Sequence, residues 1–175
     1  YKYIYILYYN IILYINYFYR YWHLDLISDM INLSFAGCGF LGVYHLGVAA
    51  CLTTHAPNFF KNITAFAGAS AGSLIAAVLA TDTSLDKCGN YIVEMTDQAR
   101  KHPLGPFNPQ FDLVKTLEKG LNLHLPDDAH RLASGRLFVS VTKVKERKNV
   151  IISHYSSREE LIKVYYNCVV IIKVF

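Results

Sequence analysis

The sequence predicts an α/β fold with parallel strands, and two observations lead to this prediction. Between residues 31 and 80, a short apolar stretch twice runs into a glycine-rich turn that is followed by a helical pattern. This order is typical of parallel sheets, because each crossover helix returns the chain to the start of the next strand. A length of 175 residues also allows one domain with a sizeable core.

The first half of the predicted domain contains two strands and two helices. Residues 31–36 are short and apolar and end at glycine, which predicts a buried strand. Residues 43–54 have small and apolar positions at helical spacing, and Pro57 ends this helix. Residues 63–67 form the second predicted strand, and residues 71–80 a second, almost wholly apolar helix.

The second half predicts more helices and a pair of strands. Residues 84–101 and 111–121 are expected to be helical, and the three prolines within 102–109 oppose regular structure between them. Residues 136–144 and 149–155 are expected to be strands joined by a charged turn. Ser157 and Glu160 have the spacing of a capping box, which predicts a further helix.

Residues 1–31 are apolar, rich in Tyr and Ile, and unlike residues 32–175. Nine of the 14 tyrosines fall within residues 1–21, and every residue type in 1–19 has a codon made only of A and T. A membrane span is one interpretation, but the uncharged stretch from Tyr3 to Tyr19 is shorter than the roughly 20 residues that a span needs. A secretory signal would need a small-residue cleavage site, and none follows. We favour translated non-coding DNA, with a marginal membrane anchor as the second interpretation.

Composition argues against several classes of function. The net charge of +4 comes without a basic stripe interleaved with aromatic residues, so we expect no nucleic-acid partner. The four cysteines are far apart and form no C-x-x-C pair, which indicates reduced thiols in a cytoplasmic protein. The seven histidines show no metal-ligand spacing, so we expect no metal.

The first glycine-rich turn, Gly37-Cys38-Gly39-Phe40-Leu41-Gly42, matches the G-x-G-x-x-G pattern of dinucleotide-binding folds. That interpretation requires an acidic residue about 20 positions further on, and none occurs between Asp29 and Asp82. We therefore expect no NAD(H) or FAD cofactor. Two alternatives remain open at this point: glycines that only permit close packing, and backbone N–H groups that cradle an anion.

The second turn, Gly68-Ala69-Ser70-Ala71-Gly72, indicates a catalytic serine. It stands where a strand meets a helix, which is the context of a G-x-S-x-G nucleophile elbow. Glycines on both sides allow a sharp turn, and the helix N-terminus adds partial positive charge near the hydroxyl. Small residues that simply pack a helix on a sheet are the structural alternative. Because the motif follows an anion cradle by one strand–helix unit, we favour Ser70 as a nucleophile.

An ordinary α/β-hydrolase is the nearest competing interpretation of the two turns. It would need an acid and a histidine later in the chain, and candidates are Asp112, Asp127 or Asp128 with His130 or His154. Each has a structural explanation, however. The aspartates after Pro126 suit a helix start, and His154 is expected on a strand. The short separation of the two turns also differs from the usual hydrolase layout.

At this point the sequence resembles the patatin-like phospholipase domain, and most closely its adipose-triglyceride-lipase subgroup. The resemblance covers about residues 32–162 and rests on five blocks: Phe35 to Tyr44, Gly68 to Gly72, Leu104 to Pro106, Ala133 to Leu137, and Asn149 to His154.

The resemblance implies a three-layer α/β/α fold and a Ser–Asp dyad without a catalytic histidine. Ser70 would attack the ester carbonyl, and the amides of Gly37, Cys38 and Gly39 would form the oxyanion hole, with Gly42, Gly68 and Gly72 as motif glycines. It implies an acylglycerol substrate, chiefly triacylglycerol, at a lipid-droplet or membrane surface, and it allows a protein co-activator as a further partner.

The sequence departs from the family at the catalytic base. The family's aspartate lies in an Asp-Gly motif beyond the Ser157 helix, but this sequence has no acidic residue after Glu160 and no Asp-Gly pair. The resemblance also stops near Val164. We therefore expect a fragment or truncated isoform that is incomplete at its C-terminal end. Two functions follow: a lipid-ester hydrolase that lacks its base in this form, or a catalytically dead module that binds a lipid surface or a partner.

Overall fold

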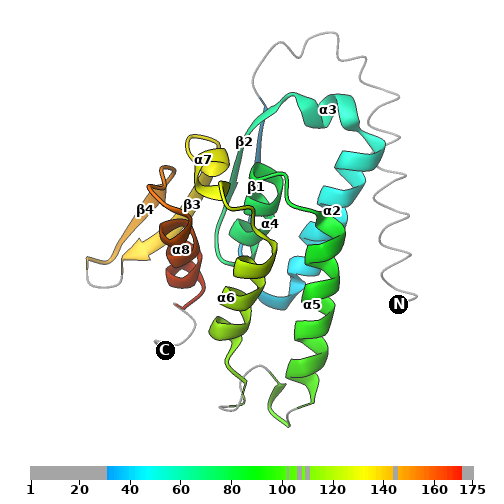
Figure 1. The fold of residues 1–175 in the computed structure, drawn as a ribbon, viewed down its shortest axis with the longest axis vertical. Coiled ribbons are helices and arrows are strands. Elements are labelled where there is room, and N and C mark those ends of the chain that lie inside the picture. The colour runs from blue at the N-terminus through cyan, green and yellow to red at the C-terminus, as the bar shows by residue number, and fades with distance from the viewer. Residues whose placement is uncertain (1–30, 102, 106–107, 109–110, 144–145, 171–175) are drawn as a thin grey trace.

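The computed structural model describes residues 31–101, 103–105, 108, 111–143 and 146–170 (Figure 1). Residues 1–30 of the predicted segment 1–31 and half of the proline-rich stretch 102–109 lie outside the described residues. Four strands form one sheet in the order β1-β2-β3-β4: β1 (Ile31–Phe35), β2 (Ile63–Gly68), β3 (Leu137–Lys143) and β4 (Lys148–Ile152). β1, β2 and β3 are mutually parallel, and β4 pairs with β3 antiparallel. The predicted α/β fold is confirmed.

The described helices follow the predicted order, with two short additions. A 3-10 turn, η1 (Gly39–Leu41), leads into α2 (Gly42–His55), and the short α3 (Pro57–Lys61) comes before β2. The remaining helices are α4 (Ala71–Ala80), α5 (Leu85–Arg100), α6 (Leu113–His124), α7 (Ala129–Ala133) and α8 (Arg158–Val170).

The described helices gather on one face of the sheet. Helices α4 and α8 pack directly on the strands, and α2, α5 and α6 pack around them (Figure 1). On the other face, Asn32 and Ser34 of β1 are exposed. Since a parallel sheet is normally covered on both faces, the part of the chain that the structure describes contains one helical side of the expected three-layer fold.

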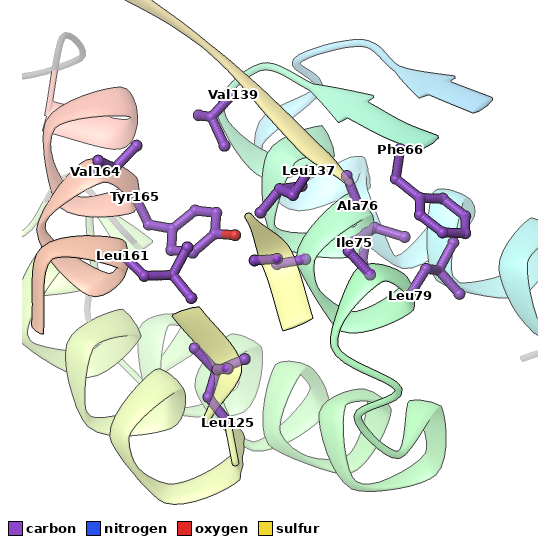
Figure 2. Close-up of a cluster of buried hydrophobic side chains, with 14 of the residues drawn as sticks. Phe66, Ile75, Ala76, Leu79, Leu125, Leu137, Val139, Leu161, Val164 and Tyr165 are labelled. Atoms are coloured by element: carbon purple, nitrogen blue, oxygen red, sulfur yellow. The ribbon is translucent and has the colours of Figure 1, made fainter. Parts of the chain in front are cut away.

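The main core lies between the sheet and the two helices that pack on it (Figure 2). Phe66, Leu137 and Val139 of the strands are fully buried there. They meet Ile75 of α4 and Leu161 of α8, and burying such side chains supplies most of the stabilisation of a domain. Because α4 carries the residues that follow Ser70, this core fixes the elbow to the sheet.

Local sequence signals explain where several helices begin. The side chain of Ser84 caps α5 by accepting the N–H of Lys87, and the carboxylate of Asp112 caps α6 by accepting the N–H of Lys115 at 3.1 Å. The predicted helix over 111–121 therefore begins at Leu113, two residues later than expected.

The predicted capping box at Ser157 is confirmed in part. The Ser157 hydroxyl accepts the N–H of Glu160 at 3.1 Å, as expected. The Glu160 carboxylate, however, accepts the N–H of Ser156 at 2.7 Å, one residue before the predicted partner. Hydrogen bonds from the hydroxyl and from the N–H of Ser156 lower the pKa of the Glu160 carboxyl. The structure also corrects the strand predicted over residues 149–155, because β4 ends at Ile152. His154 therefore lies beyond the strand and is exposed.

Candidate active site

Ser70 occupies a strained turn between β2 and α4. Its backbone angles are φ 50° and ψ −127°, in a region that side-chain-bearing residues rarely adopt. Such strain persists only where the surrounding structure imposes it, and it is concentrated at functional sites. A positive φ at the serine of a strand–turn–helix G-x-S-x-G motif has the geometry of a nucleophile elbow. Ser70 is partly exposed.

The glycines of this elbow are required by close contact between backbones. A Cβ atom on Gly68 would lie 2.5 Å from the backbone of Gly72 and Ser73, and one on Gly72 would lie 2.5 Å from the carbonyl oxygen of Ala36. Contacts this short cannot be relieved by a side-chain rotation, because the atoms they meet are backbone. The elbow is therefore pressed against the end of β1.

The first glycine-rich turn lies beside the elbow. A Cβ atom built on Gly37 would be 3.4 Å from the Cβ of Ser70, and one built on Gly42 would be 3.4 Å from the Cβ of Ala71. The N–H of Ala69 also donates to the carbonyl of Phe35 at 3.3 Å. Parallel strands that end at the same edge of the sheet explain this proximity. The structure thus brings together two turns that are separated by about 30 residues in the sequence.

The first glycine-rich turn has backbone N–H groups that are available to bind an anion. Within the described residues, the N–H groups of Gly37, Cys38 and Gly39 donate no hydrogen bond to another described residue. Gly39 has φ +55°, which turns the chain into η1 and the N-terminus of α2. Burial raises the pKa of the Cys38 thiol, which favours its protonated form.

One histidine lies close to this turn and was missed by the sequence analysis. Nε2 of His45, on α2, is 3.0 Å from the carbonyl oxygen of Ala36, and its ring meets Phe35 edge-on at 5.3 Å between centroids. The contact fixes the start of the turn. Nothing in the sequence distinguished this histidine from the others.

The aspartates and histidines that could complete an ordinary hydrolase triad lie where local structure accounts for them. Asp112 caps α6, and Asp127 and Asp128 are exposed just before α7, as expected for carboxylates at a helix start. His130 lies within α7. Nδ1 of His154 is 3.1 Å from the hydroxyl of Ser153. In the described part of the chain, no hydrogen bond joins His130 or His154 to Ser70.

Two further side chains bond to the backbone of Ser70. The N–H of Ser70 donates to Sγ of Cys168, in α8, at 2.9 Å. The hydroxyl of Ser73 donates to the carbonyl oxygen of Ser70 at 2.6 Å. Sequence analysis could not find the first contact, because 98 residues separate its partners. Of the described residues, no group of three His, Cys, Asp or Glu side chains is placed to bind a metal ion.

Comparison with known proteins identifies relatives. A family model described as patatin-like phospholipase matches residues 33–171, somewhat beyond the stretch on which the sequence resemblance rests. The chain is 54% identical over 132 residues to patatin-like phospholipase domain-containing protein 2 of Rattus norvegicus, covering 75% of this chain and 28% of that protein. It is 47% identical over 135 residues to patatin-like phospholipase domain-containing protein 4 of Homo sapiens, covering 77% of this chain and 53% of that protein.

A third relative carries a different activity in its name. The chain is 36% identical over 131 residues to the 1-acylglycerol-3-phosphate O-acyltransferase Pnpla3 of Mus musculus, covering 75% of this chain and 32% of that protein. The chain thus spans less than two thirds of the length of each of these relatives. No solved structure matches it. None of the described helices is both long enough and apolar enough to cross a bilayer.

Proposed function

Because this chain belongs to the patatin-like phospholipase family, we propose that it carries the nucleophile half of a serine lipid-ester hydrolase. The observation that carries the proposal is the strained, partly exposed Ser70 with the first glycine-rich turn packed against it. The names of the relatives, a phospholipase domain and an acyltransferase, support chemistry on lipid esters.

In the proposed reaction, Oγ of Ser70 attacks the ester carbonyl carbon and its proton passes to a base. The negative charge that develops on the carbonyl oxygen is held by the N–H groups of Gly37, Cys38 and Gly39, and each such donor is worth on the order of 10²–10³ in rate. The alcohol leaves with a proton, and water then releases the fatty acid from the serine. An acceptor alcohol in place of water would give acyl transfer instead.

The base of this proposal is an aspartate outside the sequence given. The resemblance assigns it to an Asp-Gly motif, and no such pair occurs in these 175 residues. Ser70 and that aspartate would form the dyad. Since a serine hydroxyl is a poor nucleophile until a base activates it, we expect the present chain alone to be nearly inactive.

The proposed substrate is an acylglycerol, chiefly triacylglycerol, presented at a lipid-droplet or membrane surface in the cytoplasm. Apolar side chains at the start of α2 support a lipid surface as the source: Leu41 is 70% exposed and Tyr44 47% exposed. Leu41 lies within the first glycine-rich turn, and Tyr44 follows that turn by two residues. No acidic residue lies between Asp29 and Asp82, so the two glycine-rich turns and the helices between them contribute no charge that would repel an anionic lipid.

Triolein hydrolysis by two forms of the protein tests this function. A longer form that carries the Asp-Gly segment should hydrolyse triolein, and the 175-residue chain should show no more than a trace. Equal turnover by the two forms would contradict the dyad. An inactive longer form would contradict the hydrolase proposal itself.

The second candidate function is a catalytically dead module that binds a lipid surface or a protein partner. The missing base and the exposed Leu41 and Tyr44 favour it. Flotation with phospholipid-coated triolein droplets separates the two candidates. Binding without hydrolysis in the longer form, unchanged by Ser70→Ala, would favour the module. Leu41→Asp with Tyr44→Asp should reduce flotation under either function, and Leu132→Asp on α7 is the matched exposed control.

A further inference from the structure

The backbone of Ser70 is held by side chains as well as by the turn itself. Its positive φ is unfavourable for any residue with a Cβ atom, and the elbow relaxes unless neighbouring groups over-determine it. The glycines on either side permit the turn but do not hold it, because they contribute no side chain. The groups that bond to the N–H and the C=O of Ser70 are therefore the ones that fix the position of its hydroxyl.

Cys168 connects the elbow to two other elements. Its Sγ accepts the N–H of Ser70 at 2.9 Å and donates to the backbone carbonyl of Ser140, in β3, at 3.2 Å. A thiol can do both at once, since it is a weak donor and a weak acceptor. The side chain is buried, with 6% of the residue exposed, so water does not compete for these bonds.

Ser73 holds the other side of the same peptide group. Its hydroxyl donates to the carbonyl of Ser70 at 2.6 Å and lies 3.9 Å from the sulfur of Cys168. Ser73 is fully buried, although it stands on an otherwise apolar helix. The two side chains thus form a clamp, one on the N–H and one on the C=O of the serine.

Helix α8 is anchored without the help of this sulfur. The guanidinium of Arg158 donates to the carbonyl oxygens of Asn122 at 2.8 Å and Leu125 at 3.1 Å, which ties the start of α8 to the end of α6. Leu161 and Tyr165 of α8 are also fully buried in the main core. Because α8 is fixed independently, it can serve as the rigid support from which Cys168 reaches the elbow.

We infer that Cys168 and Ser73 are positioning residues, which hold the strained backbone of Ser70 so that its hydroxyl points at the ester. The inference rests on the proposed function for its catalytic consequence. Neither side chain is assigned contact with substrate. Both act through Ser70, so their loss should lower the rate of attack by Ser70 and leave the affinity for an ester-like reagent unchanged.

The test compares four variants of the longer form that carries the Asp-Gly segment: Cys168→Ala, Cys168→Ser, Ser73→Ala and Cys51→Ala. Cys51 is the matched control, because it is a buried free cysteine on α2 with no recorded bond to the elbow.

Amide hydrogen exchange by NMR reports on the Ser70 N–H. Labelling by a long-chain alkyl fluorophosphonate, in which Oγ of Ser70 forms the P–O bond and fluoride leaves, gives a maximal rate and a half-saturating concentration. Thermal unfolding establishes that each variant is folded.

We expect Cys168→Ala to speed exchange of the Ser70 amide and to slow maximal labelling, each by roughly tenfold, at an unchanged half-saturating concentration. Cys168→Ser, which retains a donor and acceptor, should recover most of both. Ser73→Ala should slow labelling with less effect on the Ser70 amide. Cys51→Ala should change neither.

The inference is overturned if Cys168→Ala matches Cys51→Ala in both measurements, or if Cys168→Ser recovers neither. If Cys168→Ala does not fold, Ser73→Ala decides: labelling as fast as that of Cys51→Ala then overturns the inference. A longer form that takes up no label, with its Ser70 amide protected through Cys168, would contradict the hydrolase proposal and support the clamp on the backbone. A protein that is labelled although its Ser70 amide is not protected would support the hydrolase proposal and contradict the clamp.

Discussion

The two glycine-rich turns look alike in the sequence but need their glycines for different reasons. In the elbow, added Cβ atoms on Gly68 and Gly72 would collide with backbone at 2.5 Å. In the first turn, a Cβ on Gly42 would make an ordinary contact at 3.4 Å, and one on Gly39 would meet nothing within 4 Å. The elbow therefore excludes side chains by lack of space, whereas Gly39 is constrained by its φ of +55°.

This difference separates the structural and the functional contributions of the site. The elbow joins β2 to α4 and packs against the end of β1, so substitutions there should destabilise the domain. The first turn is largely open, so damage there should disturb the anion cradle while the domain remains folded. Matched substitutions in the two turns test this difference.

Ser70→Ala should have the largest effect on labelling. Without the hydroxyl there is no nucleophile, so fluorophosphonate labelling should fall to background and hydrolysis by a longer form should fall by roughly 10³-fold or more. Ser84→Ala, which removes a serine that caps α5, should still be labelled. Residual labelling of the Ser70→Ala protein would place the nucleophile elsewhere.

Gly72→Ala should have the largest effect on folding. The new methyl group would meet the backbone of Phe35 and Ala36, so we expect a loss of about 3 kcal/mol in the free energy of unfolding, measured by urea denaturation. Gly42→Ala is the matched substitution in the first turn. Its φ of −53° is helical, so its stability should change by less than about 1 kcal/mol. Equal losses from the two would remove the contrast between the turns.

Gly39→Ala should affect function more than stability. A positive φ costs an L-residue about 1–2 kcal/mol, and relief of that strain would move the neighbouring N–H groups. We expect labelling of Ser70 to slow by about tenfold or more while the protein remains folded. Gly47→Ala, on α2 with nothing within 4 Å of the added Cβ, should leave labelling unchanged and provides the control.

The smallest expected effects concern two buried tyrosines of the main core. The hydroxyl of Tyr155 bonds to the carbonyls of Ile152 at 3.0 Å and Leu137 at 3.3 Å. The hydroxyl of Tyr165, which Figure 2 shows within the core, has no partner among the described residues. Burial raises the pKa of both, so both are neutral at pH 7. Tyr155→Phe should lose about 1 kcal/mol in urea denaturation, and Tyr165→Phe should lose nothing or gain. The opposite order would contradict the described hydrogen bonds.

Much of the fold could be predicted from local patterns. The four strands, the order of the main helices and the parallel start follow from short apolar runs, glycine turns and capping residues. Errors occurred where local signals were weak: α3 begins at Pro57, which the sequence analysis took only as a helix end, and His154 lies beyond β4. Proline suits the first turn of a helix as well as the end of another, so its presence alone could not decide between them.

The sequence by itself determined the two glycine-rich turns, the candidate nucleophile and the resemblance to the patatin-like family, because each depends on residues within one short stretch. Only the tertiary structure decided that Gly37 lies against Ser70 and that Cys168 bonds to the serine's N–H. Those contacts join parallel strands and a helix almost a hundred residues away. No local pattern encodes them, because packing of the whole sheet and its helices sets where such distant segments meet.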